Sequence, residues 1–469
     1  MNFISIGFLK EAEALKEHQR RALEKLEKTP SLLVYHGTGS GKTRLALEAS
    51  KKFGMPIKAV GPASLRSNFY KERKKHHIRT PVKSYSYNKP PGEVSSNEML
   101  VFDEAHNMGQ LSTKRSKLVD KIKGGKTVYL TGTPIRNTPS ELIPLMRGLG
   151  VRTPRDAKQF NERYIEMKKQ YPGFLKMIGM EIRGEPWPTV PKAKHLGELK
   201  SLLRGKVDYY RPSMKGYPAV REKTIFVDMS PAQEHAYKIA LKQHPSIAYK
   251  IKNGISPSKA ESSQMNAFLT ATRQISNIPG MYNVNSGVAD APKINRAHQE
   301  IVSRFHANPE YRGVTYSNYL GHGIKPLAAL LEQSGVPYAL YTGELSNKEK
   351  DAIIKSYNSG EIRQLLISGA GGEGLDLKGT RLMQILEPAW NEPKLEQVKG
   401  RAVRYGSHSH LPVHHRDVEI QNFVARPREH GWFFKSREQG TDEYLRTMSK
   451  RKADLNNQFL DALQEVGSE

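Results

Sequence analysis

A glycine-rich segment near the start of the chain, SLLVYHGTGSGKT from Ser31 to Thr43, has the residue types that bind the phosphates of a nucleotide. Glycines at 37, 39 and 41 let the backbone turn its N–H groups inward around an anion, and Lys42 adds a mobile positive charge. Thr43 supplies a hydroxyl ligand for Mg²⁺. The flanking runs match the strand–loop–helix pattern of a phosphate-binding loop, although His36 replaces the usual first glycine of that pattern. The residues expected to contact the nucleotide are Gly37, Thr38, Gly39, Ser40, Gly41, Lys42 and Thr43.

Two adjacent carboxylates end a second apolar run, MLVFDEAH, at residues 99–106. Asp103 would hold Mg²⁺, directly or through water, and Glu104 would orient and deprotonate the attacking water. The alternative is an ordinary helix N-terminus, where acidic residues are also common. The phosphate-binding loop upstream, and His106 directly after the pair, favour the catalytic interpretation.

Three further segments of the first half carry weaker signals. Gln19 lies on a helix before the loop and is either an exposed glutamine or a reader of the adenine edge, to which an amide can form two hydrogen bonds. Pro62, Ser64 and Arg66 follow a buried strand, at the start of a helix, where a nucleic-acid phosphate can bind. In TVYLTGTPIRN, residues 127–137, a β-rich run ends in small hydroxyl residues, among them Thr133, that can link the nucleotide site to a facing domain.

The second half contains no further GKT sequence, but two of its segments suit a nucleotide. The glycines of GAGGEGLDL, including Gly374, permit close backbone approach, and Asp376 can meet a ribose hydroxyl or a water. In LEQVKGRAVRYGSH, Gln397, Arg401 and Arg404 fall on one helix face. The two arginines are either surface charges or arginine fingers, whose planar, permanently charged groups match phosphate oxygens.

The elements that position these residues alternate between apolar strands and amphipathic helices in two parts of the chain. This predicts an α/β protein with two parallel sheets, each covered by helices on both faces. Between them we expect a mainly helical insertion with a basic surface, which is either functional or only solvated. The expected boundaries are 1–145 for the nucleotide-binding domain, 146–291 for the insertion and linker, 292–425 for the second domain, and 426–469 for a helical tail.

Composition limits the class of protein. Lys plus Arg number 74 against 47 for Asp plus Glu, a net charge of +27, so a polyanion is the expected partner. The absence of cysteine excludes disulfides, iron–sulfur clusters and cysteine-ligated zinc. No apolar run reaches the length of a membrane span, and the start of the chain lacks the features of a secretory signal. We therefore expect a soluble, cytoplasmic protein.

The motifs GTGSGKT, DEAH and TGTP, in this order, resemble the first RecA-like domain of a superfamily-two helicase, and TGTP is the form found in Swi/Snf-type ATPases. GAGGEGLDL, WNEP and QVKGRAVR resemble the Swi/Snf-type motifs of the second domain. RYGSHSHLP is similar to the helicase-like ATPases of large DNA viruses and phages. The resemblance covers roughly residues 15–145 and 292–425. It implies two RecA-like domains in tandem, with the family's adenine-reading glutamine at Gln19 and its first DNA-contacting motif around Pro62.

This resemblance implies an ATP- and Mg²⁺-dependent translocase or helicase that hydrolyses ATP between its two domains and acts on duplex or branched DNA, as in DNA repair or branch migration. Two alternatives are a DNA-dependent ATPase subunit of a viral transcription or packaging complex, and an RNA helicase. The expected partners are DNA in preference to RNA and viral replication or transcription proteins, for a monomer in the host cytoplasm. Further expected nucleic-acid contacts are Ser317, Asn318, Thr342 and Gly343.

Three other features remain open. His408, His410, His414 and His415 are either zinc ligands or, as we expect, part of a loop that contacts phosphate or the other domain. Trp187, between two prolines, is either a core anchor, which we favour, or a base-stacking wedge. The tail has apolar residues at near-helical spacing, which predict packing on the second domain or, alternatively, a partner interface. These tail residues are Leu445, Met448, Leu455, Phe459 and Leu463.

Overall fold

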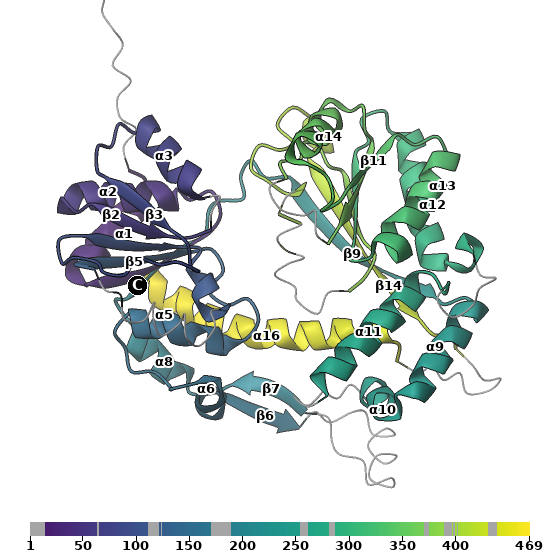
Figure 1. Ribbon diagram of the computed structural model, residues 1–469, viewed down its shortest axis with the longest axis horizontal. Coiled ribbons are helices and arrows are strands. Elements are labelled where there is room, and N and C mark those ends of the chain that lie inside the picture. Colours follow the sequence, from purple (N-terminus) through teal and green to yellow (C-terminus); the bar gives the residue numbers. More distant parts are fainter. Residues whose placement is uncertain are drawn as a thin grey trace, which may run out of the picture. The chain divides into compact units, whose positions relative to one another are not determined.

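The computed structural model (Figure 1) describes most of the chain and divides it into two units. The described residues are 15–62, 65–110, 122, 124–169, 189–253, 261–280, 287–369, 375–388, 396, 399–400, 402–429 and 439–469. The first unit comprises residues 1–168, 191–213 and 454–469, and the second comprises 169–190 and 214–453. Each unit is built on its own six-stranded sheet.

The sheet of the first unit has the order β3-β2-β4-β5-β1-β8, and every pairing in it is parallel. Its strands are β1 (Ser31–His36), β2 (Ile57–Val60), β3 (Val82–Tyr85), β4 (Met99–Asp103), β5 (Lys126–Thr131) and β8 (Val207–Tyr210). Both β1 and β4 are buried at every position. This is expected of central parallel strands, which helices cover on both faces.

Alternate residues of β1 pack into two different cores, one on each face of this sheet. Leu32 and Val34 pack with residues of α1, α2 and α3. Leu33 and Tyr35 pack with residues of η1, α5, α6 and α8 on the other face. The helices of the first unit are α1 (Glu17–Lys28), α2 (Lys42–Phe53), α3 (Leu65–Lys75), η1 (Ala105–Gln110), η2 (Pro139–Glu141), α5 (Leu142–Gly148), α6 (Ala157–Tyr164) and α8 (Leu196–Leu203).

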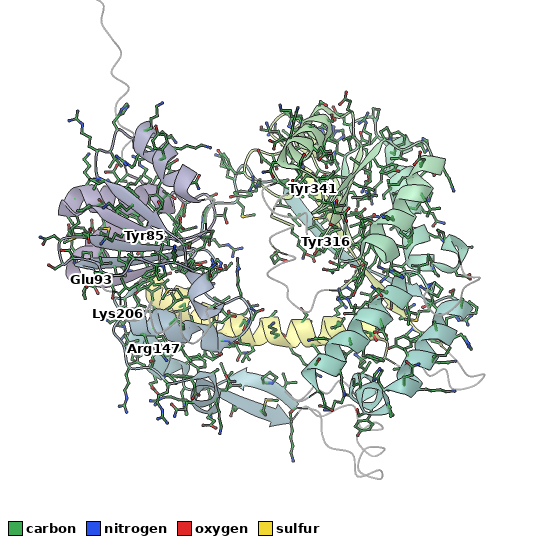
Figure 2. All side chains as sticks on the ribbon, viewed as in Figure 1. Tyr85, Glu93, Arg147, Lys206, Tyr316 and Tyr341 are labelled. Carbon is green, nitrogen blue, oxygen red and sulfur yellow. The ribbon has the colours of Figure 1, made fainter. Side chains whose placement is uncertain are left out.

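The sheet of the second unit has the order β11-β12-β10-β13-β14-β9 and is also parallel throughout. Its strands are β9 (Ala219–Asp228), β10 (Gly313–Ser317), β11 (Tyr338–Tyr341), β12 (Gln364–Ser368), β13 (Leu382–Ile385) and β14 (Asp417–Arg426). Tyr316 and Tyr341, labelled in Figure 2, share a core with Tyr357 of α14. The helices of this unit are α9 (Pro231–Gln243), α10 (Pro245–Asn253), α11 (Ser262–Asn277), η3 (Val288–Asp290), α12 (Pro292–Ala307), η4 (Leu320–Ile324), α13 (Lys325–Gln333), α14 (Asn347–Ser359) and η5 (Val413–His415).

The predicted α/β fold with two parallel sheets is confirmed, but the region between the domains contains more strand than expected. β8 completes the edge of the first sheet, and β9 pairs with β14 over ten residues at the edge of the second. A two-stranded sheet of β6 (Ile165–Lys169) and β7 (Thr189–Ala193) is also present. These strands were missed because β8 is short and contains Asp208, while charged residues interrupt β9, as is common in edge strands.

The C-terminal tail differs from its expected packing on the second domain alone. It forms one long helix, α16 (Thr441–Ser468), whose two halves belong to different cores. Tyr444, Leu445 and Met448 pack with α9, α10 and α11 of the second unit. The later apolar residues, in contrast, lie in the core of the first unit. These are Leu455, Phe459, Leu463 and Val466. Helical periodicity correctly indicated a buried face, but it does not identify the surface that buries it.

Three further expectations concern membrane-spanning helices, metal-binding clusters and the role of Trp187. Within the described ranges, no helix is both long enough and apolar enough to cross a lipid bilayer. The same ranges contain no group of three or more histidine, aspartate or glutamate side chains able to hold a metal ion. Trp187 lies outside the described residues, so its role as anchor or wedge stays a prediction.

Candidate functional site

The glycine-rich loop leaves β1 at His36 and ends where α2 begins at Lys42. Gly41, the residue before α2, has φ of 79°, a left-handed conformation that glycine adopts without steric cost. Gly41 is the N-cap residue of α2 and has no side chain to cap the helix, so this helix N-terminus is suited to an anion. The hydroxyl of Ser40 is buried and also lacks a hydrogen-bond partner in the described part of the chain. This cradle fits a phosphate group.

The ammonium group of Lys42 is held by main-chain carbonyl oxygens at the start of the loop, directly after β1. Its Nζ donates to the carbonyl of His36 at 2.9 Å and to that of Gly37 at 3.2 Å. Burial lowers the pKa of Lys42, while the nearby carboxylates of Glu104 and Asp103 act in the opposite direction. The three predicted members of one catalytic group therefore lie within electrostatic reach of each other.

Gln19 is buried against the phosphate loop, with 2% of its surface exposed, so the alternative of an exposed glutamine is wrong. Its Nε2 donates to the carbonyls of Ser40, at 3.4 Å, and Gly41, at 3.3 Å. Its Oε1 accepts from the backbone N–H of Lys16 and closes the first turn of α1. The backbone angle requires glycine at position 41, whereas the Gln19 Nε2 atom that lies 2.7 Å from the place of a Cβ ends a flexible side chain and could shift. Adenine reading by Gln19 stays a prediction.

The acidic pair follows β4 as expected, and the two carboxylates have different environments. Burial and the neighbouring Glu104 raise the pKa of Asp103 to about 6, against the hydrogen bond that its Oδ1 accepts from the Glu104 N–H at 2.9 Å. A buried carboxylate of this kind is suited to a divalent cation. Glu104 has φ of 51°, which is uncommon for a residue with a side chain, and its carboxylate is 41% exposed. Tyr87 supports the turn by donating its hydroxyl to the carbonyl of Asp103 at 2.9 Å.

His106 connects the acidic pair to the TGTP segment. Its Nδ1 lies 3.0 Å from Thr131 Oγ1, 3.4 Å from Thr133 Oγ1 and 3.4 Å from Glu104 Oε2. Burial, with smaller contributions from Arg136 and Lys42, lowers the pKa of His106 to about 3, so the imidazole is neutral. The sequence marked His106 only as supporting the motif and gave it no role of its own.

Asp208 is a residue of this site that sequence reasoning missed. It lies on β8 beside β1, is fully buried, and its Oδ2 is 2.6 Å from Nε2 of His36. The one available signal was His36 itself, because a histidine that replaces a loop glycine and becomes buried needs a polar partner. A short strand far along the chain gave no sign that it would supply one.

In the second unit, two of the predicted nucleotide-contacting residues come together. Arg404 Nη1 lies 3.0 Å from Asp376 Oδ1, and both side chains are partly exposed, at 36% and 63%. The guanidinium is thus paired with a carboxylate that solvent or a ligand can displace. Gly374, Gln397 and Arg401 lie outside the described residues, and their roles stay predictions.

The loop after β10 is organised by Glu387, a fully buried carboxylate that the sequence did not single out. Its Oε1 accepts the Ser317 hydroxyl at 2.6 Å, and its Oε2 accepts the Asn318 N–H at 2.9 Å. Ser317 is therefore buried with its hydroxyl committed inside the protein, which does not favour the predicted contact with nucleic acid. Asn318 is partly exposed; of the other two predicted contacts, Thr342 is buried and Gly343 is exposed after β11.

The first unit carries an exposed basic surface on α3, close in sequence to the predicted nucleic-acid contacts. Phe69 is buried and anchors the helix on the sheet, whereas Tyr70 is 68% exposed. Lys71, Lys74 and Lys75 are exposed on the same helix; we call these three and Tyr70 the α3 surface. Pro62, partly exposed, ends the preceding segment, while Ser64 and the side chain of Arg66 lie outside the described residues.

The four histidines near residue 410 do not share one site. His408 is buried, with Nδ1 2.9 Å from Ser407 Oγ and Nε2 2.8 Å from the carbonyl of Thr380. His415 instead contacts Glu310 at 3.1 Å and lies edge-to-face against His414. The described ranges contain no group of three or more histidine, aspartate or glutamate side chains placed to hold a metal ion, and the expected contact of this loop with phosphate or the other domain stays a prediction.

Comparison with known proteins gives consistent similarities over nearly the whole chain. Residues 23–281 match the SNF2-related domain, and residues 292–406 match the helicase conserved C-terminal domain. A protein of Acanthamoeba polyphaga mimivirus, provisionally named ATP-dependent RNA helicase L538, is 30% identical, with 95% of each chain covered. A termination factor NPH-I homolog of African swine fever virus is 26% identical, over 94% of this chain and 76% of the relative. The Hef helicase domain of Pyrococcus furiosus has a similar fold, with a TM-score of 0.51, 13% identity and coverage of 88% and 95%.

Proposed function

Since the chain belongs to the SNF2-related family of helicase-type ATPases, we propose that it is an ATP-driven motor that moves along duplex or branched DNA. The observation that carries the proposal is the nucleotide site of the first unit, where Lys42, held by the carbonyls of His36 and Gly37 after β1, and Asp103, the last residue of β4, follow strands of one parallel sheet. DNA is preferred to RNA because TGTP is the Swi/Snf-type form of its motif. The net charge of +27 agrees with a polyanionic track.

The residues of the first unit fit ATP with Mg²⁺. When bound, ATP supplies the phosphoanhydride bond whose hydrolysis drives movement. Lys42 exchanges two carbonyl acceptors for phosphate oxygens, and the uncapped start of α2 with the Ser40 hydroxyl provides further donors. Asp103, together with Thr43, is suited to hold the cation, because its carboxylate is buried and forms no hydrogen bond with a cationic side chain among the described residues. Glu104, more exposed, orients water and accepts its proton.

In this proposal the second unit adds positive charge at the phosphates to the charge that Lys42 supplies from the first unit. We assign Arg404 and Arg401 to the charge that develops on the phosphates, together with Gln397, and place Asp376 and Gly374 near the nucleotide. Arg404 lies after the helical residue Ala402 and not on a helix, in contrast to the helix face that the sequence predicted. Arg404 then leaves its partner Asp376 for the phosphate. Because residues of both units are needed, hydrolysis depends on their joint action, which is how we propose that ATP turnover is coupled to movement.

Nucleic acid is held mainly through its backbone in this proposal. The contacts come from the start of α3, the α3 surface and the segment after β5 in the first unit, and from the loops after β10 and β11 in the second. Binding of this kind is salt-sensitive and largely independent of sequence. Pro62, Ser64, Arg66, Thr133, Asn318, Thr342 and Gly343 are the assigned residues.

Two rival functions come from the names of relatives. The mimivirus relative is named an RNA helicase, and the African swine fever virus relative is named a termination factor homolog. The first predicts that RNA stimulates the motor, and the second predicts that ATP turnover serves a transcription complex without strand separation.

Displacement of a third strand from a DNA triplex distinguishes these functions, because a motor tracking on the duplex removes that strand without unwinding the duplex. We expect ATP-dependent displacement by the wild type and none by Lys42→Ala. Unwinding of an RNA duplex without triplex displacement would establish the RNA helicase instead. Turnover stimulated by DNA, with neither displacement nor unwinding, would favour the transcription-complex subunit.

A further inference from the structure

The phosphate loop of this chain departs from its family pattern at one position, and the structure pairs that departure with a second residue. His36 stands where the pattern has glycine, and its imidazole is fully buried against Asp208 of β8. We infer that Asp208 is a positioning residue of the nucleotide site, which fixes the phosphate loop through His36 and the adenine-reading helix through Arg21. This inference rests on the proposed function, and it assigns to Asp208 a part in the preference of this site for ATP over other nucleotides.

Asp208 is a charged hub with partners on two different elements. On the loop side, its Oδ2 lies 2.6 Å from His36 Nε2. On the α1 side, its Oδ1 accepts from Arg21 Nε at 2.8 Å and lies 3.3 Å from Lys25 Nζ. Arg21 also donates to Asp208 Oδ2 at 3.3 Å and to the carbonyl of Tyr209. Both carboxylate oxygens are therefore occupied.

The position of His36 makes this hub relevant to the phosphates. The carbonyl of His36 is the nearer of the two acceptors that hold Lys42 Nζ. The imidazole therefore anchors the same residue whose main chain places the catalytic ammonium. A glycine here would leave the loop entrance without this side-chain anchor and would leave Asp208 with its two α1 cations only.

The position of Arg21 makes the hub relevant to the base. Gln19 lies two residues earlier on α1 and contacts the carbonyls of Ser40 and Gly41. Because α1 is bound to β8 through Asp208, its rotation about its own axis is fixed, and with it the direction of the Gln19 amide. His18 adds to this by stacking on Tyr210 of β8, with ring centroids 3.6 Å apart and planes 3° from parallel.

The segment after β8 also packs directly on the loop. A Cβ on Gly37 would lie 2.5 Å from Cδ of Pro212, so the glycine is required for this approach. The N–H of Gly37 donates to the carbonyl of Tyr210 at 2.9 Å. β8 and the residues after it thus form one side of the loop, and Asp208 is the charged group that fastens them to it.

If the Gln19 amide is misplaced, the preference for adenine over guanine falls more than the overall affinity for the nucleotide. This is because a purine is selected by the geometry of its hydrogen bonds. We therefore expect Asp208→Asn to weaken ATP binding about tenfold, the loss of roughly one charge-assisted hydrogen bond. The preference for ATP over GTP should fall as well, because α1, which carries Gln19, is less firmly fixed to β8 once its ion pairs with Asp208 are weakened. A merely structural residue would lower stability without changing this preference.

The experiment measures binding of fluorescent ATP and GTP analogues to the full chain in the absence of nucleic acid. The variants are Asp208→Asn, His36→Gly and the double variant. Asp442→Asn is the matched control, because Asp442 is also a fully buried carboxylate paired with a lysine, Lys293, in the second unit. Thermal unfolding of each variant establishes that it is folded at the assay temperature.

The expected result is that His36→Gly weakens ATP binding in the wild type but changes it less than about twofold when Asp208 is already Asn, as for residues that act through one shared interaction. ATP preference falls in Asp208→Asn and is unchanged in Asp442→Asn. Additive losses in the double variant, or an unchanged ATP preference in a folded Asp208→Asn, would overturn the inference.

If Asp208→Asn does not fold, Arg21→Lys is the second variant, because it keeps the positive charge but removes the paired guanidinium hydrogen bonds. Arg21→Lys must reduce the preference for ATP over GTP, and an unchanged preference would overturn the inference equally. Failure of the motor proposal would appear separately, as absent triplex displacement by a wild type that still binds ATP.

Discussion

Nδ1 of His106 lies 3.0 Å from Oγ1 of Thr131, so the segment after the acidic pair is joined to the end of β5. The same nitrogen is 3.4 Å from Glu104 Oε2, and Thr131 Oγ1 accepts the N–H of Thr133 at 3.1 Å. A neutral histidine therefore lies between the proposed catalytic carboxylate and the TGTP segment. We proposed that Thr133 contacts nucleic acid, and a shift of this segment on binding would then be transmitted to Glu104 through His106.

Removing the imidazole should separate ATP hydrolysis from its stimulation. We expect His106→Ala to lower the DNA-stimulated rate about tenfold, a typical coupling energy between two sites, and to change the unstimulated rate much less. Steady-state ATPase assays with and without duplex DNA measure both rates. His306→Ala, which removes an exposed histidine of α12, is the control. Equal loss of both rates would show that His106 serves catalysis or folding rather than coupling.

The pair of Arg404 and Asp376 predicts two variants of very different severity. Arg404→Ala should lower kcat by about 10³, the lower range for an arginine finger. Asp376→Asn should change kcat by less than about threefold, since its interaction of roughly 1 kcal/mol with a partly exposed guanidinium is given up before Arg404 reaches the phosphate. Arg296→Ala, on an exposed face of α12, controls for loss of charge. A kcat within about threefold of wild type for Arg404→Ala would remove Arg404 from the catalytic assignment.

The α3 surface should contribute to the salt dependence of DNA binding. Replacing Lys71, Lys74 and Lys75 by glutamine is expected to reduce the slope of log K against log salt by about 0.9 for each DNA phosphate that is no longer neutralised. Fluorescence anisotropy with a labelled duplex at several salt concentrations gives this slope. The matched control replaces three exposed lysines elsewhere, Lys158, Lys238 and Lys242. An unchanged slope, or an equal change in the control, would mean that the α3 surface is only solvated.

Acid stability provides a test in the second unit, at the strand pair of β9 and β14. Burial would raise the pKa of Glu419, but hydrogen bonds from Lys223 and Gln421 and the charge of Arg304 lower it to about 2. Because the folded-state pKa lies below the unfolded value, this carboxylate stabilises the fold above about pH 4.5 and loses its contribution between about pH 4.5 and 2. Glu419→Gln should therefore cost about 1 kcal/mol at pH 7, after solvent screening is allowed for, and less at pH 3.

Thermal unfolding at both pH values measures this difference, with the exposed Glu361→Gln as the control. A destabilisation by Glu419→Gln that is as large at pH 3 as at pH 7 would contradict the assigned pKa.

The sequence was most informative where one short motif contains both the functional residues and the strand, turn and helix that position them. The loop from His36 to Lys42 and the acidic pair were predicted in place, because strand, turn and helix follow one another within a few residues. The two parallel sheets were predicted from alternation for the same reason. Periodicity also identified the buried face of α16.

Long-range partners were not predictable from the sequence. Asp208 lies 172 positions from His36, and Glu387 lies 70 positions from Ser317, so no local pattern joins either pair. Ser317 shows the consequence, since a polar residue at a strand end was expected to face nucleic acid and is instead bound to a buried carboxylate. The second half of α16 could not be assigned to the first unit either, because an apolar helix face does not specify its partner.

The most direct test of the central claim is the rate of ATP hydrolysis by the purified chain, alone and with single-stranded DNA, duplex DNA, forked DNA and RNA. Lys42→Ala serves as the blank, because it removes the ammonium held at the start of the loop. We predict strong stimulation by duplex or forked DNA, little by RNA, and no hydrolysis above background by the variant. Stimulation by RNA alone, or hydrolysis by Lys42→Ala at the wild-type rate, would contradict a DNA-driven motor that uses this nucleotide site.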